Sequence, residues 1–68
     1  MPTMRLGSSG DEVTELQNIL DSAGYSVVVD SQFGRSTEDA VKRFQSEHGL
    51  PADGIVGPNT WQVLESLG

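Results

Sequence analysis

Two stretches decide the fold of this chain: Asp30-Ser31-Gln32-Phe33-Gly34-Arg35-Ser36-Thr37 and Asp53-Gly54-Ile55-Val56-Gly57-Pro58-Asn59-Thr60. Each reads Asp, two variable residues, an apolar residue, Gly, two further residues and Thr, and each leads into helically spaced apolar residues. A shorter echo, Val13-Thr14-Glu15-Leu16-Gln17 and Val41-Lys42-Arg43-Phe44-Gln45, twice places Gln directly after an apolar residue. Reuse of parts within 68 residues predicts one small module, spanning residues 1–68, built by internal duplication of a loop-helix unit.

The residues of the repeated loops suit a structural role. An Asp side chain accepts backbone N–H groups in a turn, and Gly permits a positive φ. Phe33 and Val56 are expected to enter the core, and the Thr hydroxyl of each copy to bond back toward its loop. Gln17 and Gln45 occupy matching helical places, where we expect them to hydrogen-bond loop backbone rather than a ligand.

The first helix is predicted to start at Ser9. Ser9 and Glu12 have the spacing of a capping box, in which Ser9 is the N-cap. Gly24 suits the left-handed position just past the helix end. The intervening apolar residues at three-and-four spacing are expected to form one buried face: Val13, Leu16, Ile19, Leu20 and Ala23.

Two more helices are predicted downstream. One begins close after Gly34 and runs to His48, and the other begins at Gly57, because Pro58 is a good first helical residue. The Val27-Val28-Val29 run favours extended structure, and we expect a buried connector or one arm of a short hairpin. The fold class is therefore all-α, a small three-helix orthogonal bundle. Its predicted core includes Leu16, Leu20, Phe33, Val41, Phe44, Val56 and Leu64.

Composition excludes several functions. The net charge is −6 with four basic residues, too few to neutralise a nucleic-acid backbone or an anionic membrane surface. The chain has no Cys and one His, so a thiolate or multi-histidine metal site within it is excluded, and no cofactor is expected. No apolar run approaches the ~18 residues of a spanning helix, and the start lacks the layout of a secretory signal.

No constellation of catalytic residues is evident. The carboxylates lie mostly opposite the apolar stripes, so a solvated face is preferred to a glycosidase pair. His48, in the last turn of its helix, suits the negative helix end better than general-base work. We find no nucleophile elbow, Walker loop or His-Glu-x-x-His motif. The chain is interpreted as a non-enzyme.

Residues along nearly the whole chain, from about Leu6 to Leu67, resemble the three-helix peptidoglycan-binding domain, an accessory module of bacterial and phage cell-wall hydrolases, amidases, carboxypeptidases and spore-cortex enzymes. The first loop departs from the family pattern, which usually has Asp-Gly where this chain has Asp30-Ser31. The resemblance rests on Leu6-Gly7-Ser8-Ser9-Gly10, Val13, Leu16-Gln17, Leu20, Gly24-Tyr25, Asp30, Phe33-Gly34, Thr37, Ala40-Val41, Phe44-Gln45, Gly49-Leu50, Asp53-Gly54-Ile55-Val56-Gly57, Thr60 and Trp61.

The resemblance implies a non-catalytic, monomeric module that binds peptidoglycan glycan or stem peptide and holds a fused or associated hydrolase near its polymer, in a cell-wall, periplasmic or extracellular setting. The alternative is a protein-binding adapter or inhibitory module on the same fold. The related pro-region of matrix metalloproteinases inhibits through a Cys beyond the helices, and this chain has none.

The ligand is expected where the two repeated loops meet. If the duplicated units pack together, two helix N-termini border one groove and offer N–H groups to a carboxylate or an acetamide carbonyl. Arg35 would add a charged donor and Trp61 an apolar wall, although core packing is the preferred role of Trp61. The candidate ligand-binding residues are Phe33, Gly34, Arg35, Gly54, Ile55, Gly57 and Trp61.

Overall fold

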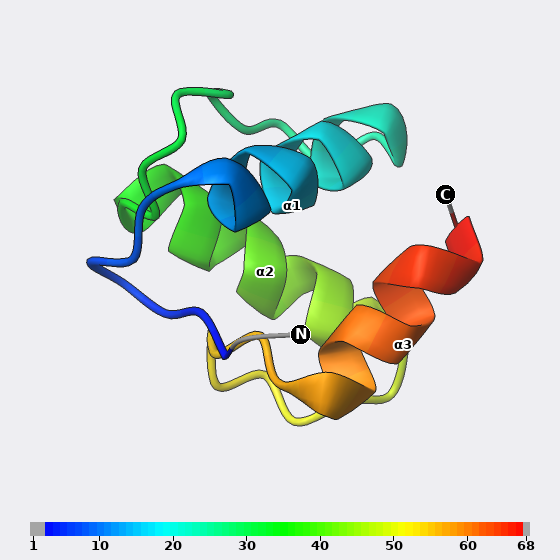
Figure 1. The fold of residues 1–68 in the computed structure, drawn as a ribbon. Helices are drawn as coiled ribbons and strands as arrows, with labels where there is room; N and C mark the ends of the chain where they lie inside the picture. Colours follow the sequence, from blue (N-terminus) through cyan, green and yellow to red (C-terminus); the bar gives the residue numbers. More distant parts are fainter. Residues whose placement is uncertain (1–2, 68) are drawn as a thin grey trace.

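Three helices build the described part of the chain, residues 3–67 of a computed structural model. They are α1 (Asp11–Ser22), α2 (Arg35–Glu47) and α3 (Pro58–Leu67). Helix α1 packs against both α2 and α3, and α3 lies across one end of the α1–α2 pair (Figure 1). Residues 3–67 contain two isolated β-bridges and no strand. The prediction of an all-α three-helix fold is confirmed.

The start of α1 differs from the prediction. Gly10, not Ser9, is the N-cap, and no side chain caps the helix. Ser9 instead forms a bridge with Gln32, and the Gly10 N–H donates to the Ser31 carbonyl at 3.0 Å. Gly10 has a φ of 120°, which an L side chain rarely adopts. Pairing with the first loop therefore overrides the local capping signal.

The segment before α1 connects both repeated loops. Met4 exchanges backbone hydrogen bonds with Val56 at 3.0 and 2.8 Å. Three residues further on, the Gly7 N–H donates to the Phe33 carbonyl at 2.9 Å, and the Phe33 N–H donates to the Ser8 carbonyl at 2.8 Å. Met4 is 3% exposed, so the packed core includes a residue two positions before Leu6, where the family resemblance begins.

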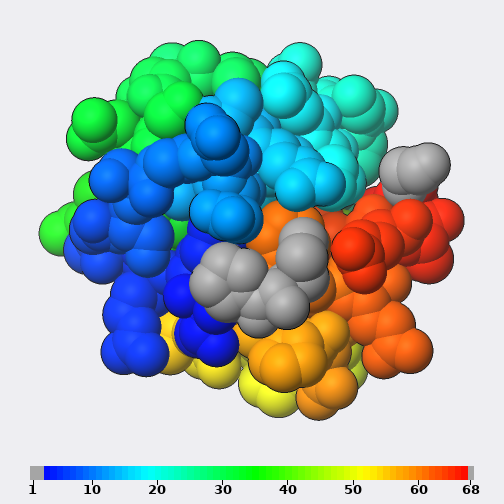
Figure 2. Space-filling model, in the orientation of Figure 1, coloured from blue at the N-terminus to red at the C-terminus, as the bar shows by residue number. Residues whose placement is uncertain are grey.

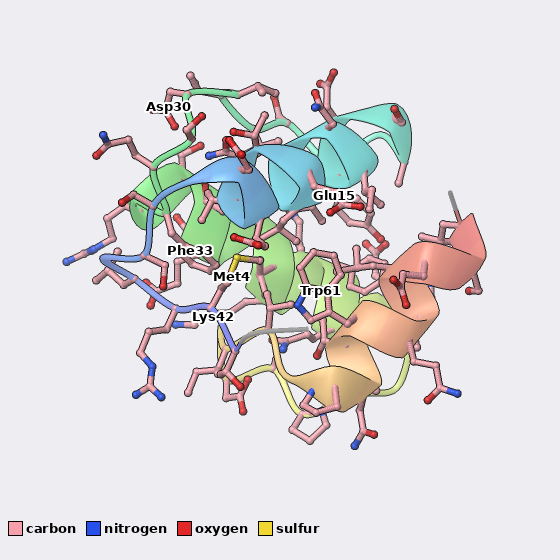
Figure 3. The ribbon with its side chains drawn as sticks, in the orientation of Figure 1. Met4, Glu15, Asp30, Phe33, Lys42 and Trp61 are labelled. Carbon is pink, nitrogen blue, oxygen red and sulfur yellow. The ribbon has the colours of Figure 1, made fainter. Side chains whose placement is uncertain are left out.

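The core lies between the three helices and confirms all seven predicted residues, each of them buried. The Tyr25 ring meets Phe44 edge-on, with their centroids 5.8 Å apart, and the exposed His48 ring lies tilted by 30° with its centroid 4.2 Å from that of Phe44. Figure 3 shows Met4, Phe33 and Trp61 directed into the space that the helices enclose. The buried apolar residues outside these seven are Met4, Val13, Tyr25, Ala40 and Trp61.

The predicted burial of the extended connector is wrong. Val28 and Val29 are 63% and 42% exposed, and only Val27 packs partly against the core. The chain leaves α1 through Gly24 at a φ of 96° and is anchored by Tyr25, whose N–H donates to the Leu20 carbonyl at 2.9 Å. The segment after Tyr25, residues 26–32, is mostly exposed on the outside of the bundle.

Candidate functional site

One buried glutamine of α1 organises the first repeated loop. The Gln17 carbonyl oxygen accepts the N–H groups of Asp30 and Ser31 at 3.1 and 3.0 Å. Its amide nitrogen donates to the Asp30 carboxylate at 3.1 Å, the Gln32 carbonyl at 2.9 Å and the Thr37 hydroxyl at 3.0 Å. Gln17 is completely buried, so these bonds replace all of its contact with water.

The second loop repeats this arrangement around Gln45 of α2. The Gln45 carbonyl oxygen accepts the Gly54 N–H at 3.0 Å. Its amide nitrogen donates to the Asp53 carboxylate at 3.1 Å, the Ile55 carbonyl at 2.8 Å and the Thr60 hydroxyl at 3.2 Å. Helix α2 thus belongs to both units, since it follows the first loop and carries the glutamine that holds the second. The two loops thus repeat one arrangement, and the preferred role of both glutamines is confirmed.

The loop aspartates are occupied by the protein itself. The Gln32 N–H donates to the Asp30 carboxylate at 3.0 Å, and the Ile55 N–H donates to the Asp53 carboxylate at 2.9 Å. These backbone bonds, together with the glutamine amides, lower the pKa of Asp30 and of Asp53 below the ordinary value of an aspartate. Both carboxylates therefore shape their loops.

The departure from the family pattern at Ser31 is accommodated by a local contact. Ser31 has a φ of 67°, close to the 75° of Gly54 at the matching place. A non-glycine residue is strained in this region. In partial compensation, the Ser31 hydroxyl is hydrogen-bonded to the Thr14 hydroxyl of α1. The backbone of the first loop therefore keeps the same shape with a side chain in place of a bare glycine.

The seven candidate ligand-binding residues divide into two groups. Phe33 and Trp61 are 2% and 1% exposed, and Gly54 is buried beneath side chains of α2. A wall formed by Trp61 is therefore incompatible with its position in the core. The other group reaches the surface: Arg35 is exposed, and Gly34, Ile55 and Gly57 are half-buried.

The two loops do not share the hollow beside α3. That hollow, of about 160 Å³, is lined by Ile55, Gly57 and the first turn of α3, and by no residue of the first loop. The segment from Met4 to Gly10 pairs with both loops and links them. At the first loop, the N-terminus of α2 has no side-chain cap, and Arg35 is its first residue. The geometry therefore offers two separate small surfaces.

A larger concave region, not predicted from the sequence, lies between α1 and α3. It consists of two adjoining hollows of about 420 and 570 Å³, which share Asn18 and Ile19. The sequence predicts Ile19 and Ala23 on the buried face of α1, but Ile19 is only partly buried and Ala23 is exposed. The sequence signal for this region is a second stripe along α1, formed at three-and-four spacing by Asp11, Glu15, Asn18 and Ser22. We call it the α1–α3 groove; Figure 2 shows the corresponding face of the molecule.

The described residues provide neither a metal-binding cluster nor a membrane-spanning helix. Within residues 3–67, no group of three or more His, Cys, Asp or Glu side chains is arranged to hold a metal ion. None of the three helices has the length and apolar character needed to cross a membrane. His48 lies at the C-cap of α2, where its Nδ1 is 2.9 Å from the Phe44 carbonyl.

Comparison with known proteins identifies the family. The family model described as "Putative peptidoglycan binding domain" matches residues 9–64. The zinc D-Ala-D-Ala carboxypeptidase of Streptomyces albus G is 46% identical over 70 residues, covering 96% of this chain and 27% of the carboxypeptidase. The chain thus spans about a quarter of that relative.

Solved structures agree with the sequence comparison. The Burkholderia AP3 phage endolysin superposes with a TM-score of 0.92 at 48% identity, over 96% of this chain and 25% of the endolysin chain. The SleB N-terminal domain superposes with a TM-score of 0.92 at 39% identity, over 98% of this chain and 94% of that one. The match therefore includes the helices and both glutamine-held loops, and the chain belongs to the peptidoglycan-binding domain family.

Proposed function

We propose that this chain binds peptidoglycan without cleaving it and thereby holds a cell-wall hydrolase, fused or associated, at its polymer. The observation that carries the proposal is the family match over residues 9–64, which contains both repeated loops. The carboxypeptidase and endolysin relatives extend well beyond the matched part. In such proteins the matched part would supply attachment, and the remainder the chemistry.

The polar groups of this chain support a binding role over a catalytic one. The carboxylates of Asp30 and Asp53 each accept one hydrogen bond from their own loop backbone and one from a glutamine amide, so they are engaged in holding the loops. In the described part of the chain, every buried side-chain nitrogen or oxygen has a hydrogen-bond partner. A general acid or base needs a group that is free to exchange a proton with substrate.

The loop surfaces remain our proposal for one point of contact with the polymer. The N-terminus of α2 lacks a side-chain cap and carries the exposed Arg35. Helix N–H groups and a guanidinium together favour a carboxylate or an acetamide carbonyl. At the second loop, Ile55 and Gly57 line the hollow beside α3. The buried candidates, among them Phe33 and Trp61, would support these surfaces from beneath.

Co-sedimentation with purified sacculi tests the proposal. The chain is expected to enrich in the pellet with sacculi of at least one chemotype, and no soluble muropeptide is expected in the supernatant. Arg35→Ala should weaken retention, whereas Arg5→Ala, which removes the same charge from an exposed residue before α1, should leave it unchanged. A chain that stays in the supernatant with sacculi of every chemotype would contradict wall binding. Released fragments would contradict the non-catalytic role.

A further inference from the structure

The α1–α3 groove has one continuous wall from α1. Asp11, Glu15, Asn18, Ile19 and Ser22 follow one another at intervals of one turn or less along a single side of the helix. This side is distinct from the buried face of α1 that holds the core. Figure 3 shows Glu15 directed toward α3 across the gap. The opposite wall comes from the last turns of α3, with Glu65 in one hollow and Leu67 in the other.

The two ends of the groove differ in chemistry. One end is mainly apolar: Ile19, Tyr25 and Leu67 line it, and Leu67 is 48% exposed. His48 also lines this end, and since its Nδ1 donates to a carbonyl, its Nε2 is the nitrogen left for a ligand. The second end carries three carboxylates, Asp11, Glu15 and Glu65.

The described residues at this end of the groove carry negative charge only. Neither lysine nor arginine occurs among the described residues that line the two hollows. Of the four basic residues of the chain, one precedes α1 and three lie on α2. In a protein of net charge −6, this end of the groove favours a cation and disfavours an anion.

We infer that the α1–α3 groove binds a peptide that carries a free side-chain ammonium group beside small apolar side chains. The ammonium would lie among Asp11, Glu15 and Glu65, and the apolar side chains against Ile19, Tyr25 and Leu67. This inference rests on the proposed function and deepens it, because the peptidoglycan component with this chemistry is the uncrosslinked stem peptide. Its diamino residue supplies the amine, and its alanines supply methyl groups.

A peptide fits the groove better than a glycan strand does. A neutral sugar gains nothing from three neighbouring carboxylates, and a free lactyl carboxylate on the glycan would be repelled by them. The hollows, at about 420 and 570 Å³, lie in the size range of sites that hold small ligands. Crosslinking acylates the amine, so the groove is expected to prefer uncrosslinked stems.

Titration with two synthetic peptides tests this inference. The probes are Nα-acetyl-L-Ala-D-isoGln-L-Lys-D-Ala-D-Ala, whose only amine is the lysine Nε, and the same peptide acetylated also on that Nε. The readout is the amide chemical shifts of the full chain. The free-amine peptide should shift the amides around Glu15, Asn18 and Glu65, and acetylation should weaken its affinity about fivefold or more. Glu15→Gln should weaken the free-amine peptide about two- to fivefold, the range of an exposed ion pair, and leave the acetylated peptide unchanged.

Glu12→Gln is the matched control, because it removes the same charge from an exposed residue of α1 that does not line the groove. Its effect on the free-amine peptide should be small. Equal affinity for both peptides, or shifts confined to residues 31–36 and 53–59, would overturn the inference. If the chain still sediments with sacculi in that case, the proposed function stands and only the groove assignment fails. Loss of both would refute the proposed function itself.

Discussion

Replacing Gln45 by Met removes the hydrogen bonds of the second loop while roughly keeping side-chain volume. The amide makes four bonds, of 2.8 to 3.2 Å, and the side chain is 1% exposed. After the substitution, the buried Gly54 N–H, the Ile55 carbonyl and the Thr60 hydroxyl lose their partner. An unsatisfied buried group costs about 1–3 kcal/mol. Some relaxation toward water is expected, so we predict a loss of about 3–5 kcal/mol in the free energy of unfolding.

Such a loss is a large fraction of the stability of a domain of this size, which is expected to be about 3–10 kcal/mol. Urea denaturation followed by the fluorescence of Trp61 would measure it, since this residue lies in the core. Gln62→Met provides the control, because Gln62 is an exposed residue of α3. A Gln45→Met protein whose free energy of unfolding lies within about 1 kcal/mol of that of Gln62→Met would refute the reasoning.

Four further outcomes follow from the structure. Phe44→Ala should cost about 3–5 kcal/mol, because Phe44 is completely buried, and a melting temperature within a degree or two of the parent would contradict this. Gly54→Ser should lose about 1–2 kcal/mol at its φ of 75°. Ser31→Gly should be nearly neutral in urea denaturation, because relief of strain offsets the lost hydroxyl bond. The free energy of unfolding should fall on acidification, because folding lowers the pKa of Asp30 and of Asp53. The stability that these two carboxylates contribute is fully present above the unfolded-state pKa of about 3.9. It is lost as the pH falls through their lower folded-state pKa values. In urea denaturation at a series of pH values, Asp53→Asn should lose less stability on acidification than the parent chain does.

The parts of the fold that sequence analysis predicted correctly are those whose contacts lie close along the chain or are repeated. Gln45 reaches a loop that begins eight residues later, and the same pattern occurs around Gln17. Glycine and proline signals placed both ends of α2 and the start of α3 within about a residue. Repetition of a Gln, an Asp and a Thr at related positions makes both loops recognisable from the sequence.

The errors come from contacts between distant segments. Ser9 has the local pattern of a helix cap, but it pairs with Gln32, more than twenty residues away. Met4 carried no periodic signal and is nevertheless in the core, through its pairing with Val56. Val28 has a strong preference for extended structure, yet no neighbouring strand is present in residues 3–67 to cover it.

The candidate site was less predictable than the fold. The repeated pattern marks the two loops as important, but the sequence does not show whether their residues bind a ligand or are held by a buried glutamine. Arg35 lies at the surface and Trp61 in the core, although both belong to the first turn of a helix. The α1–α3 groove depends on how two helices cross, and this crossing is set by packing and not by the pattern of either helix alone.

Depletion of the chain from solution by increasing amounts of purified sacculi tests the central claim most directly. The account predicts saturable binding, with the supernatant free of soluble muropeptides by mass spectrometry, and competition by a muropeptide digest of the same sacculi. One isolated small domain is expected to bind weakly, since its full-length relatives can add further contacts to the same polymer. A depletion curve that stays flat for sacculi of every chemotype would contradict the account.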